Sequence, residues 1–148
     1  MEFLNYLLVS IAVFSGLLGG WIVGRIAKEE LKNGKKYFVL LQRILFSAIL
    51  LLVILFSIKN IWLSLFFISA MIYFFAGKNT FKDITVYLLF SIIFYLSQNR
   101  LFLLQASLMF TYGFPAGSLI YMKKKTVKDI VVRHIWFIFL ALALFLVV

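Results

Sequence analysis

The side chains best suited to chemistry are basic residues that recur at a fixed spacing. Six lysines align when the chain is shifted by 46 residues, namely Lys32, Lys36, Lys78, Lys82, Lys124 and Lys128. Arg43 and Arg133 follow two of these groups, at places where a long side chain can reach a lipid interface. Ammonium and guanidinium groups bind phosphates and carboxylates. These residues therefore predict a site for an anionic ligand or a lipid headgroup.

Three interpretations of the basic residues remain open. In the first, they only set the membrane topology. In the second, they bind anionic lipid headgroups, and each residue contributes about 1 kcal/mol to the binding free energy. In the third, they hold a phosphorylated substrate or an acidic partner. Nucleic acid is not expected as a partner, because membrane topology already accounts for the net charge of +10.

The remaining ionisable groups indicate no catalytic centre. The chain has no cysteine, and His134 is its one histidine. Every acid except Glu2 lies in or beside a basic stretch, namely Glu29, Glu30, Asp83 and Asp129. We therefore expect no metal, no cofactor and no intramembrane carboxylate relay of the kind found in many pumps. A membrane enzyme that uses these acids and a divalent cation on a lipid phosphate is the less favoured alternative.

These residues must be positioned by membrane-spanning helices. The chain is 65% hydrophobic and 14% charged, whereas soluble domains are about 25% charged, and its mean hydropathy is +1.10. We predict an all-α, polytopic transmembrane bundle that forms a single domain over residues 1–148. Six spans are expected, at residues 3–27, 37–58, 61–77, 80–98, 101–122 and 130–148. Because the third and fourth spans are short, five spans are the alternative.

The basic residues also predict an orientation. Thirteen of the fifteen Lys and Arg residues fall in three stretches, at residues 25–43, 78–82 and 123–133. Because Lys and Arg accumulate in cytoplasmic loops, these stretches should face the cytoplasm of a cell whose plasma membrane holds the protein. Both termini should then lie outside, with Lys59 and Arg100 at the outer turns.

A weak internal repeat accompanies the lysine spacing. Residues 80–86, TFKDITV, recur as TVKDIVV at residues 126–132. One interpretation is three helical hairpins in tandem. The other is that each copy is a capping box, in which Thr and the acid three residues later satisfy free backbone groups at a helix start.

Small residues predict close helix packing. Gly16, Gly20 and Gly24 form a stripe on the first span, and such stripes let two backbones approach closely in lipid. The partner is either another span of the same chain or a second copy in a homo-oligomer.

The fourth and fifth spans carry the expected hinge or path. Pro115 lies between Gly113 and Gly117, and proline kinks a helix. Uncharged polar residues also line the spans, including Gln42, Ser91, Tyr87, Tyr95, Gln105 and Tyr112. They serve either interhelical hydrogen bonds or a polar cavity.

The sequence thus favours a non-catalytic membrane protein that moves a small anionic molecule or lipid. The alternative is a structural or assembly subunit of a larger membrane complex. Membrane lipids, including anionic ones, are the expected partners in either case.

Overall fold

The chain folds into a bundle of helices. The computed structural model describes residues 2–57, 60–76, 83–98, 101–123 and 126–147, and the regular structure in these ranges is entirely helical. The helices are α1 (Phe3–Ile26), α2 (Lys28–Phe56), α3 (Ile61–Ala76), α4 (Asp83–Leu96), α5 (Phe102–Met122), α6 (Val127–His134) and α7 (Trp136–Val147). Lys78, Lys82 and Lys124 of the predicted anion site lie outside the described residues, as do Lys59 and Arg100.

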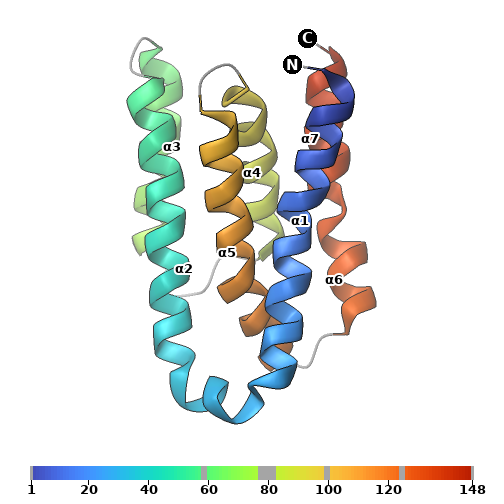
Figure 1. The fold of residues 1–148 in the computed structure, drawn as a ribbon. Coiled ribbons are helices and arrows are strands. Elements are labelled where there is room, and N and C mark those ends of the chain that lie inside the picture. Colours follow the sequence, from blue (N-terminus) through green and yellow to red (C-terminus); the bar gives the residue numbers. More distant parts are fainter. Residues whose placement is uncertain (1, 58–59, 77–82, 99–100, 124–125, 148) are drawn as a thin grey trace.

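The helices run roughly along one axis and alternate in direction. Both termini lie at one end of the bundle, and the junction of α1 with α2 lies at the other end, together with the end of α5 and the start of α6 (Figure 1). We call this second end the basic end. Its described basic residues are Arg25, Lys28, Lys32, Lys35, Lys36, Lys123 and Lys128, all of them exposed.

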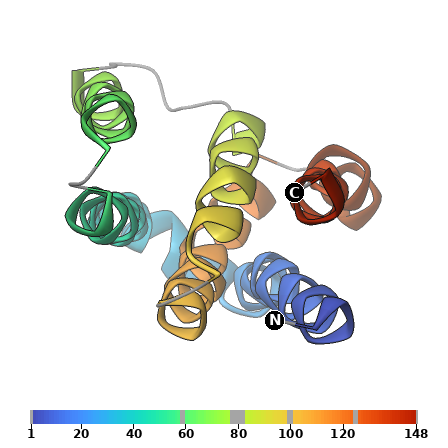
Figure 2. The same cartoon turned by 90° about the horizontal axis from the view of Figure 1, so that it is seen from above.

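Seen from above, α5 lies between α1 and α2, and α4 lies further inside the bundle (Figure 2). The most extensive contact joins α1 to α5, and the next joins α2 to α5. Helix α3 packs mainly against α2, and α7 packs against α4 and α1. Helix α5 is therefore the centre of the packing, with α3 at the periphery.

Two helix boundaries differ from the predicted spans for physical reasons. Residues 28–36, expected as a loop, form the first turns of α2, which cross the basic end (Figure 1). This segment has no proline, and Glu29 and Glu30 lie in its first turn, where negative charge favours a helix start. The last span begins at Val127 and divides into α6 and α7 at Ile135.

Length and composition support a membrane protein but do not by themselves establish six spans. Three helical stretches are long and apolar enough to cross a bilayer, namely Phe3–Ile26, Lys28–Phe56 and Val127–Val147, which joins α6 to α7. Shorter apolar stretches occur at Ile61–Phe74 and Thr85–Leu96. Helix α3, with 16 residues, is about 24 Å long at 1.5 Å per residue, less than the roughly 30 Å hydrocarbon core.

The outer surface of the helices is more apolar than that of a soluble protein. Large apolar side chains face outward on the helices, with Trp62 80% and Leu103 71% exposed. A few polar side chains are buried among the apolar ones, namely Ser10, Ser91, Gln105, Ser118 and His134. An outer surface of this kind suits contact with lipid rather than water.

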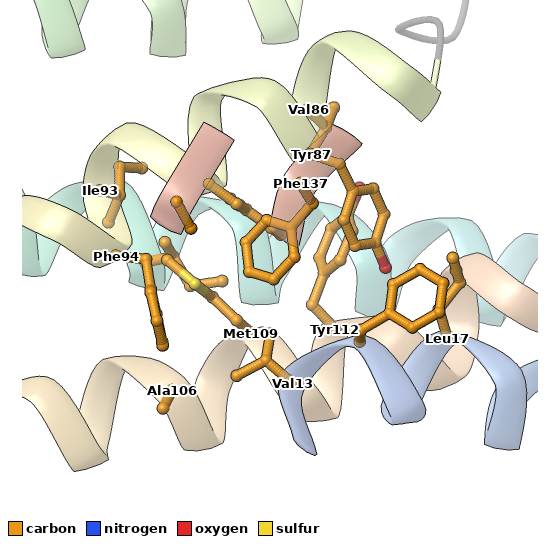
Figure 3. Close-up of a cluster of buried hydrophobic side chains, with 14 of the residues drawn as sticks. Val13, Leu17, Val86, Tyr87, Ile93, Phe94, Ala106, Met109, Tyr112 and Phe137 are labelled. Atoms are coloured by element: carbon orange, nitrogen blue, oxygen red, sulfur yellow. The ribbon is translucent and has the colours of Figure 1, made fainter. Parts of the chain in front are cut away.

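The interior is filled by aromatic and aliphatic side chains. Tyr87, Phe94 and Phe137 converge on Met109 and Tyr112 of α5 from two neighbouring helices (Figure 3). Each of these five side chains is no more than 1% exposed. The ring centroids of Phe94 and Phe137 lie 5.9 Å apart at an interplanar angle of 61°, a geometry that favours aromatic pairs.

Glycines bring the backbones of α1 and α5 together. A Cβ atom built on Gly20 would lie 2.6 Å from the carbonyl oxygen of Gly113, and one on Gly113 would lie 2.5 Å from the backbone nitrogen of Leu17. A Cβ on Gly16 would meet the Phe110 carbonyl oxygen, and one on Gly24 would lie 3.1 Å from Ser118 Cα. The glycine stripe of α1 is therefore covered by α5 of the same chain and is not available to a second copy in this arrangement.

Side-chain hydroxyl and amide groups join the helices to one another. Ser118 Oγ donates to the carbonyl oxygen of Gly20 at 2.8 Å, and Ser91 Oγ donates to that of Phe137 at 3.1 Å. Tyr6 donates its hydroxyl proton to the Ala141 carbonyl at 3.2 Å. Such bonds contribute about 0.6 to 2 kcal/mol each between helices in lipid. Several of the polar residues noted in the sequence, namely Gln42, Ser91 and Gln105, thus form hydrogen bonds between helices.

Candidate functional site: a buried polar cluster near the basic end

A hydrogen bond between α2 and α5 places polar groups inside the bundle. Gln42 Nε2 donates to the hydroxyl oxygen of Tyr112 at 2.7 Å, although the two residues are 70 positions apart. Tyr112 is 1% exposed, and Gln42 is partly buried. A polar pair in such a position is costly unless each group has a partner. The bond gives both groups a partner and fixes the position of α2 along α5.

Tyr87 extends this pair toward the last helix. Its ring lies edge-on to that of Tyr112, with centroids 6.2 Å apart, and edge-on to the imidazole of His134, with centroids 5.0 Å apart. The three rings belong to α4, α5 and α6, and Gln42 adds α2. We call these four residues, Gln42, Tyr87, Tyr112 and His134, the polar cluster.

His134 occupies a defined orientation in the cluster. It is 1% exposed, and its Nδ1 lies 2.9 Å from the carbonyl oxygen of Ile130. Because a carbonyl oxygen only accepts, Nδ1 must carry the proton, and in the neutral ring Nε2 is then an acceptor. The Nε2 atom is buried. The imidazole thus presents its second nitrogen to the protein interior.

The helix that carries His134 is tightened directly after it. Ile135 separates α6 from α7, and the amide of Ile138 bonds to the carbonyl of Ile135 at 3.0 Å, the tighter spacing of a 3₁₀ turn. Ile135 itself keeps α-helical dihedral angles, and its amide bonds to the Val131 carbonyl at 2.9 Å, so the helix is not broken there. A capping box starts α6, because Thr126 Oγ1 accepts from the Asp129 amide at 3.3 Å while Asp129 accepts from the Thr126 amide at 3.0 Å.

The predicted basic site residues that the structure describes are exposed and are not part of the polar cluster. Lys32, Lys36 and Arg43 on α2, and Lys128 and Arg133 on α6, are all exposed. In the described part of the chain, no Lys or Arg side chain is buried in the bundle. Positive charge is thus available at the basic end, and neutral donors and acceptors occupy the interior.

The residues predicted as a hinge or path take part in the packing. Gly113 and Gly117 lie against the α1 backbone, and Pro115 is buried between them. Gln105 Nε2 donates to the carbonyl oxygen of Ile49 at 2.9 Å, while Tyr95 is partly buried. The glycine segment of α5 thus lies in close contact with α1.

The acids do not assemble into a metal site within the described residues. In that part of the chain, no three His, Asp or Glu side chains lie close enough together to hold a metal ion. The carboxylate of Asp129 takes part in the capping box, and Glu29 and Glu30 are exposed in the first turn of α2.

Residue spacing alone did not single out the polar cluster. Tyr87 and Tyr112 appear in the sequence among many polar residues of the spans, and the contact of Tyr87 with His134 links elements that sequence spacing does not relate. Comparison of the chain with protein-family models, with curated proteins and with solved structures gives no match. Function must therefore be argued from the chemistry of the site.

Proposed function

We propose that the protein is a six-span membrane protein that facilitates the movement of a phosphate-bearing anion, either an anionic phospholipid or a small free phosphate compound. In this proposal the three basic stretches face the cytoplasm and both termini face outward across the plasma membrane. Helices α3 and α4 span the bilayer together with the residues next to them.

The polar cluster is the observation that carries this proposal. Four helices contribute its members, which lie inside the bundle near the basic end, beside the 3₁₀ turn at Ile135. Tyrosine hydroxyls and a glutamine amide can donate hydrogen bonds to phosphate oxygens. Exposed lysines at the basic end would raise the local concentration of an anion before it reaches these donors.

The packing indicates which parts would move. Because Gly20 and Gly113 bring two backbones into contact, α1 and α5 would move as one unit. Helix α2 would join this unit, because its most extensive contact is with α5, and α4, α6 and α7 would form a second unit, in accordance with their pairwise contacts. The polar cluster lies where these two units meet, so a small displacement between them would open or close it.

Flux into lipid vesicles tests the proposal and separates the two sources of phosphate. The purified protein is reconstituted, and transfer of fluorescent phosphatidylglycerol between leaflets is measured alongside uptake of radiolabelled inorganic phosphate. We expect one of these fluxes to exceed that of protein-free vesicles. Tyr112→Phe removes the hydroxyl that binds Gln42 and should reduce that flux about tenfold.

Tyr73→Phe is the matched control, because it removes a hydroxyl from a side chain on α3 that is 71% exposed. This variant should retain the flux of the unmodified protein. Equal fluxes in vesicles with and without protein, for both probes, would refute the proposed function. Equal losses in the two variants would show that the polar cluster is not the path.

An assembly subunit is the second candidate function. The observation in its favour is α3, which packs mainly against α2 and exposes Trp62 and Ile72 by 80% and 62%. A membrane partner could cover this apolar face. The glycines of α1 do not provide such a face, because α5 covers them.

A further inference from the structure

An anion inside this bundle would need a positive charge beside it. Transferring an unpaired charge from water to a medium of low polarity is very unfavourable. Every described Lys and Arg is exposed, so none of them supplies a fixed positive charge in the interior. Buried tyrosines cannot supply it either, because a phenol ionises to an anion.

Among the described residues, His134 is the buried side chain that could provide this charge. Imidazole gains a proton, and with it a positive charge, in the range of about pH 5 to 8. Its Nδ1 proton is already held by the Ile130 carbonyl at 2.9 Å, so an added proton would go to the buried Nε2. That nitrogen would then donate to a ligand oxygen within the polar cluster.

We propose that His134 is a proton-binding site that supplies the counter-charge for a phosphate-bearing anion, so that the proton and the anion bind the bundle together. This inference rests on the proposed function, because it concerns how the cargo is accommodated in the polar cluster. A protonated imidazole and a phosphodiester monoanion together carry no net charge. Release of the anion would then accompany release of the proton.

Among the described residues, the helices packed around His134 carry few other ionisable groups. Tyr87 of α4 contacts its ring, and Tyr112 of α5 lies one ring further away. On α6 itself Lys128, Asp129 and Arg133 are exposed. Helix α7 has no ionisable side chain over Trp136–Val147. Helix α1 contributes Tyr6 and the exposed Arg25, and α4 begins at Asp83, one turn before Tyr87.

Nitrogen NMR of the single histidine tests the inference without any transport measurement. The ¹⁵N-histidine protein in phosphatidylcholine nanodiscs is titrated from pH 4 to 9 with dimethyl phosphate, which remains a monoanion in this range. Neutral trimethyl phosphate is the matched control. If the anion binds the protonated ring tenfold more tightly, the midpoint should rise by about one pH unit. An equal midpoint with the two probes would overturn the inference.

The pH dependence of flux gives a second, independent test. In the unmodified protein the anion flux should fall about tenfold as pH rises through the titration of His134. His134→Gln should abolish this dependence and leave the low flux of alkaline pH, whereas Arg133→Gln and Asp83→Asn should preserve the profile. An unchanged profile in His134→Gln, or its loss in Asp83→Asn, would place the proton elsewhere. Absence of flux in the unmodified protein would refute the proposed function, and the NMR result would still decide the inference.

Discussion

The contact of α1 with α5 makes a quantitative prediction about stability. In Gly20→Ala the new Cβ would lie 2.6 Å from the Gly113 carbonyl oxygen and 2.7 Å from Phe114 Cα. Both are backbone atoms, so the helices must move apart rather than let a side chain rotate. Overpacking costs about 1 to 3 kcal/mol, and alanine recovers up to about 1 kcal/mol through its helix propensity. We expect a net loss of about 1 kcal/mol.

Two other glycines provide matched controls for this substitution. A Cβ on Gly34 would meet only the ring of Phe38, at 3.8 Å, so Gly34→Ala should stabilise the protein by about 0.5 to 1 kcal/mol. A Cβ on Gly19 would meet the ring of Phe114 at 3.3 Å, a side chain that can adjust. Gly19→Ala should therefore be close to neutral.

The assay is reversible unfolding in mixed micelles, in which helicity is measured at increasing concentrations of a denaturing detergent. Gly20→Ala and Gly34→Ala should differ by about 2 kcal/mol, roughly thirtyfold in the unfolding equilibrium. Gly117→Ala should resemble Gly20→Ala, because its Cβ would lie 2.7 Å from the Trp21 backbone nitrogen. If Gly20→Ala were as stable as Gly34→Ala, the two backbones would not be in contact and the account of the packing would be wrong.

Three further predictions concern the hydrogen bonds and charges of the bundle. Ser118→Ala removes the 2.8 Å bond to the Gly20 carbonyl and should lower the unfolding free energy by about 0.6 to 2 kcal/mol in the same assay. An unchanged unfolding free energy would show that this hydrogen bond does not stabilise the bundle. Thr126→Ala breaks the capping box of α6 and should cost about 1 kcal/mol, with faster amide exchange over Val127–His134 as the readout and unchanged exchange as the contrary result. Replacing Lys32 and Lys36 together by Gln removes two exposed charges of the basic end, at about 1 kcal/mol each. Retention of phosphatidylglycerol should then fall by about tenfold or more, and equal retention would show that these lysines do not bind headgroups.

The long apolar helices could be predicted from the sequence because their ends coincide with changes in polarity. The expected third span, residues 61–77, and fifth span, residues 101–122, correspond to α3 at Ile61–Ala76 and α5 at Phe102–Met122. Residues 28–36 could not be assigned in the same way. Their polarity indicates exposure, and exposed residues form helices and loops alike.

Which helices pair, and in which register, could not be derived from spacing. Both the first and the fifth spans carry glycines four residues apart, but the sequence does not show that Gly20 faces Gly113. The polar cluster could not be predicted from the sequence for the same reason. Gln42 and Tyr112 are bonded across 70 residues, and neither residue is unusual for its own helix.

The repeat at a spacing of 46 residues remains a prediction. Its second copy contains a capping box between Thr126 and Asp129, while Thr80 of the first copy lies outside the described residues. The same spacing separates Ser91 from Phe137, which are hydrogen-bonded between α4 and α7 but lie outside the two copies.

Native mass spectrometry of the protein released from its own membrane tests the central claim most directly, because it detects bound anions and partner subunits in one spectrum. We predict a bound phosphate-bearing species on the unmodified protein that is lost in Tyr112→Phe and kept in Tyr73→Phe. A stoichiometric complex with another polypeptide, with no phosphate-bearing ligand on either variant or on the unmodified chain, would contradict the proposed function and favour the assembly subunit.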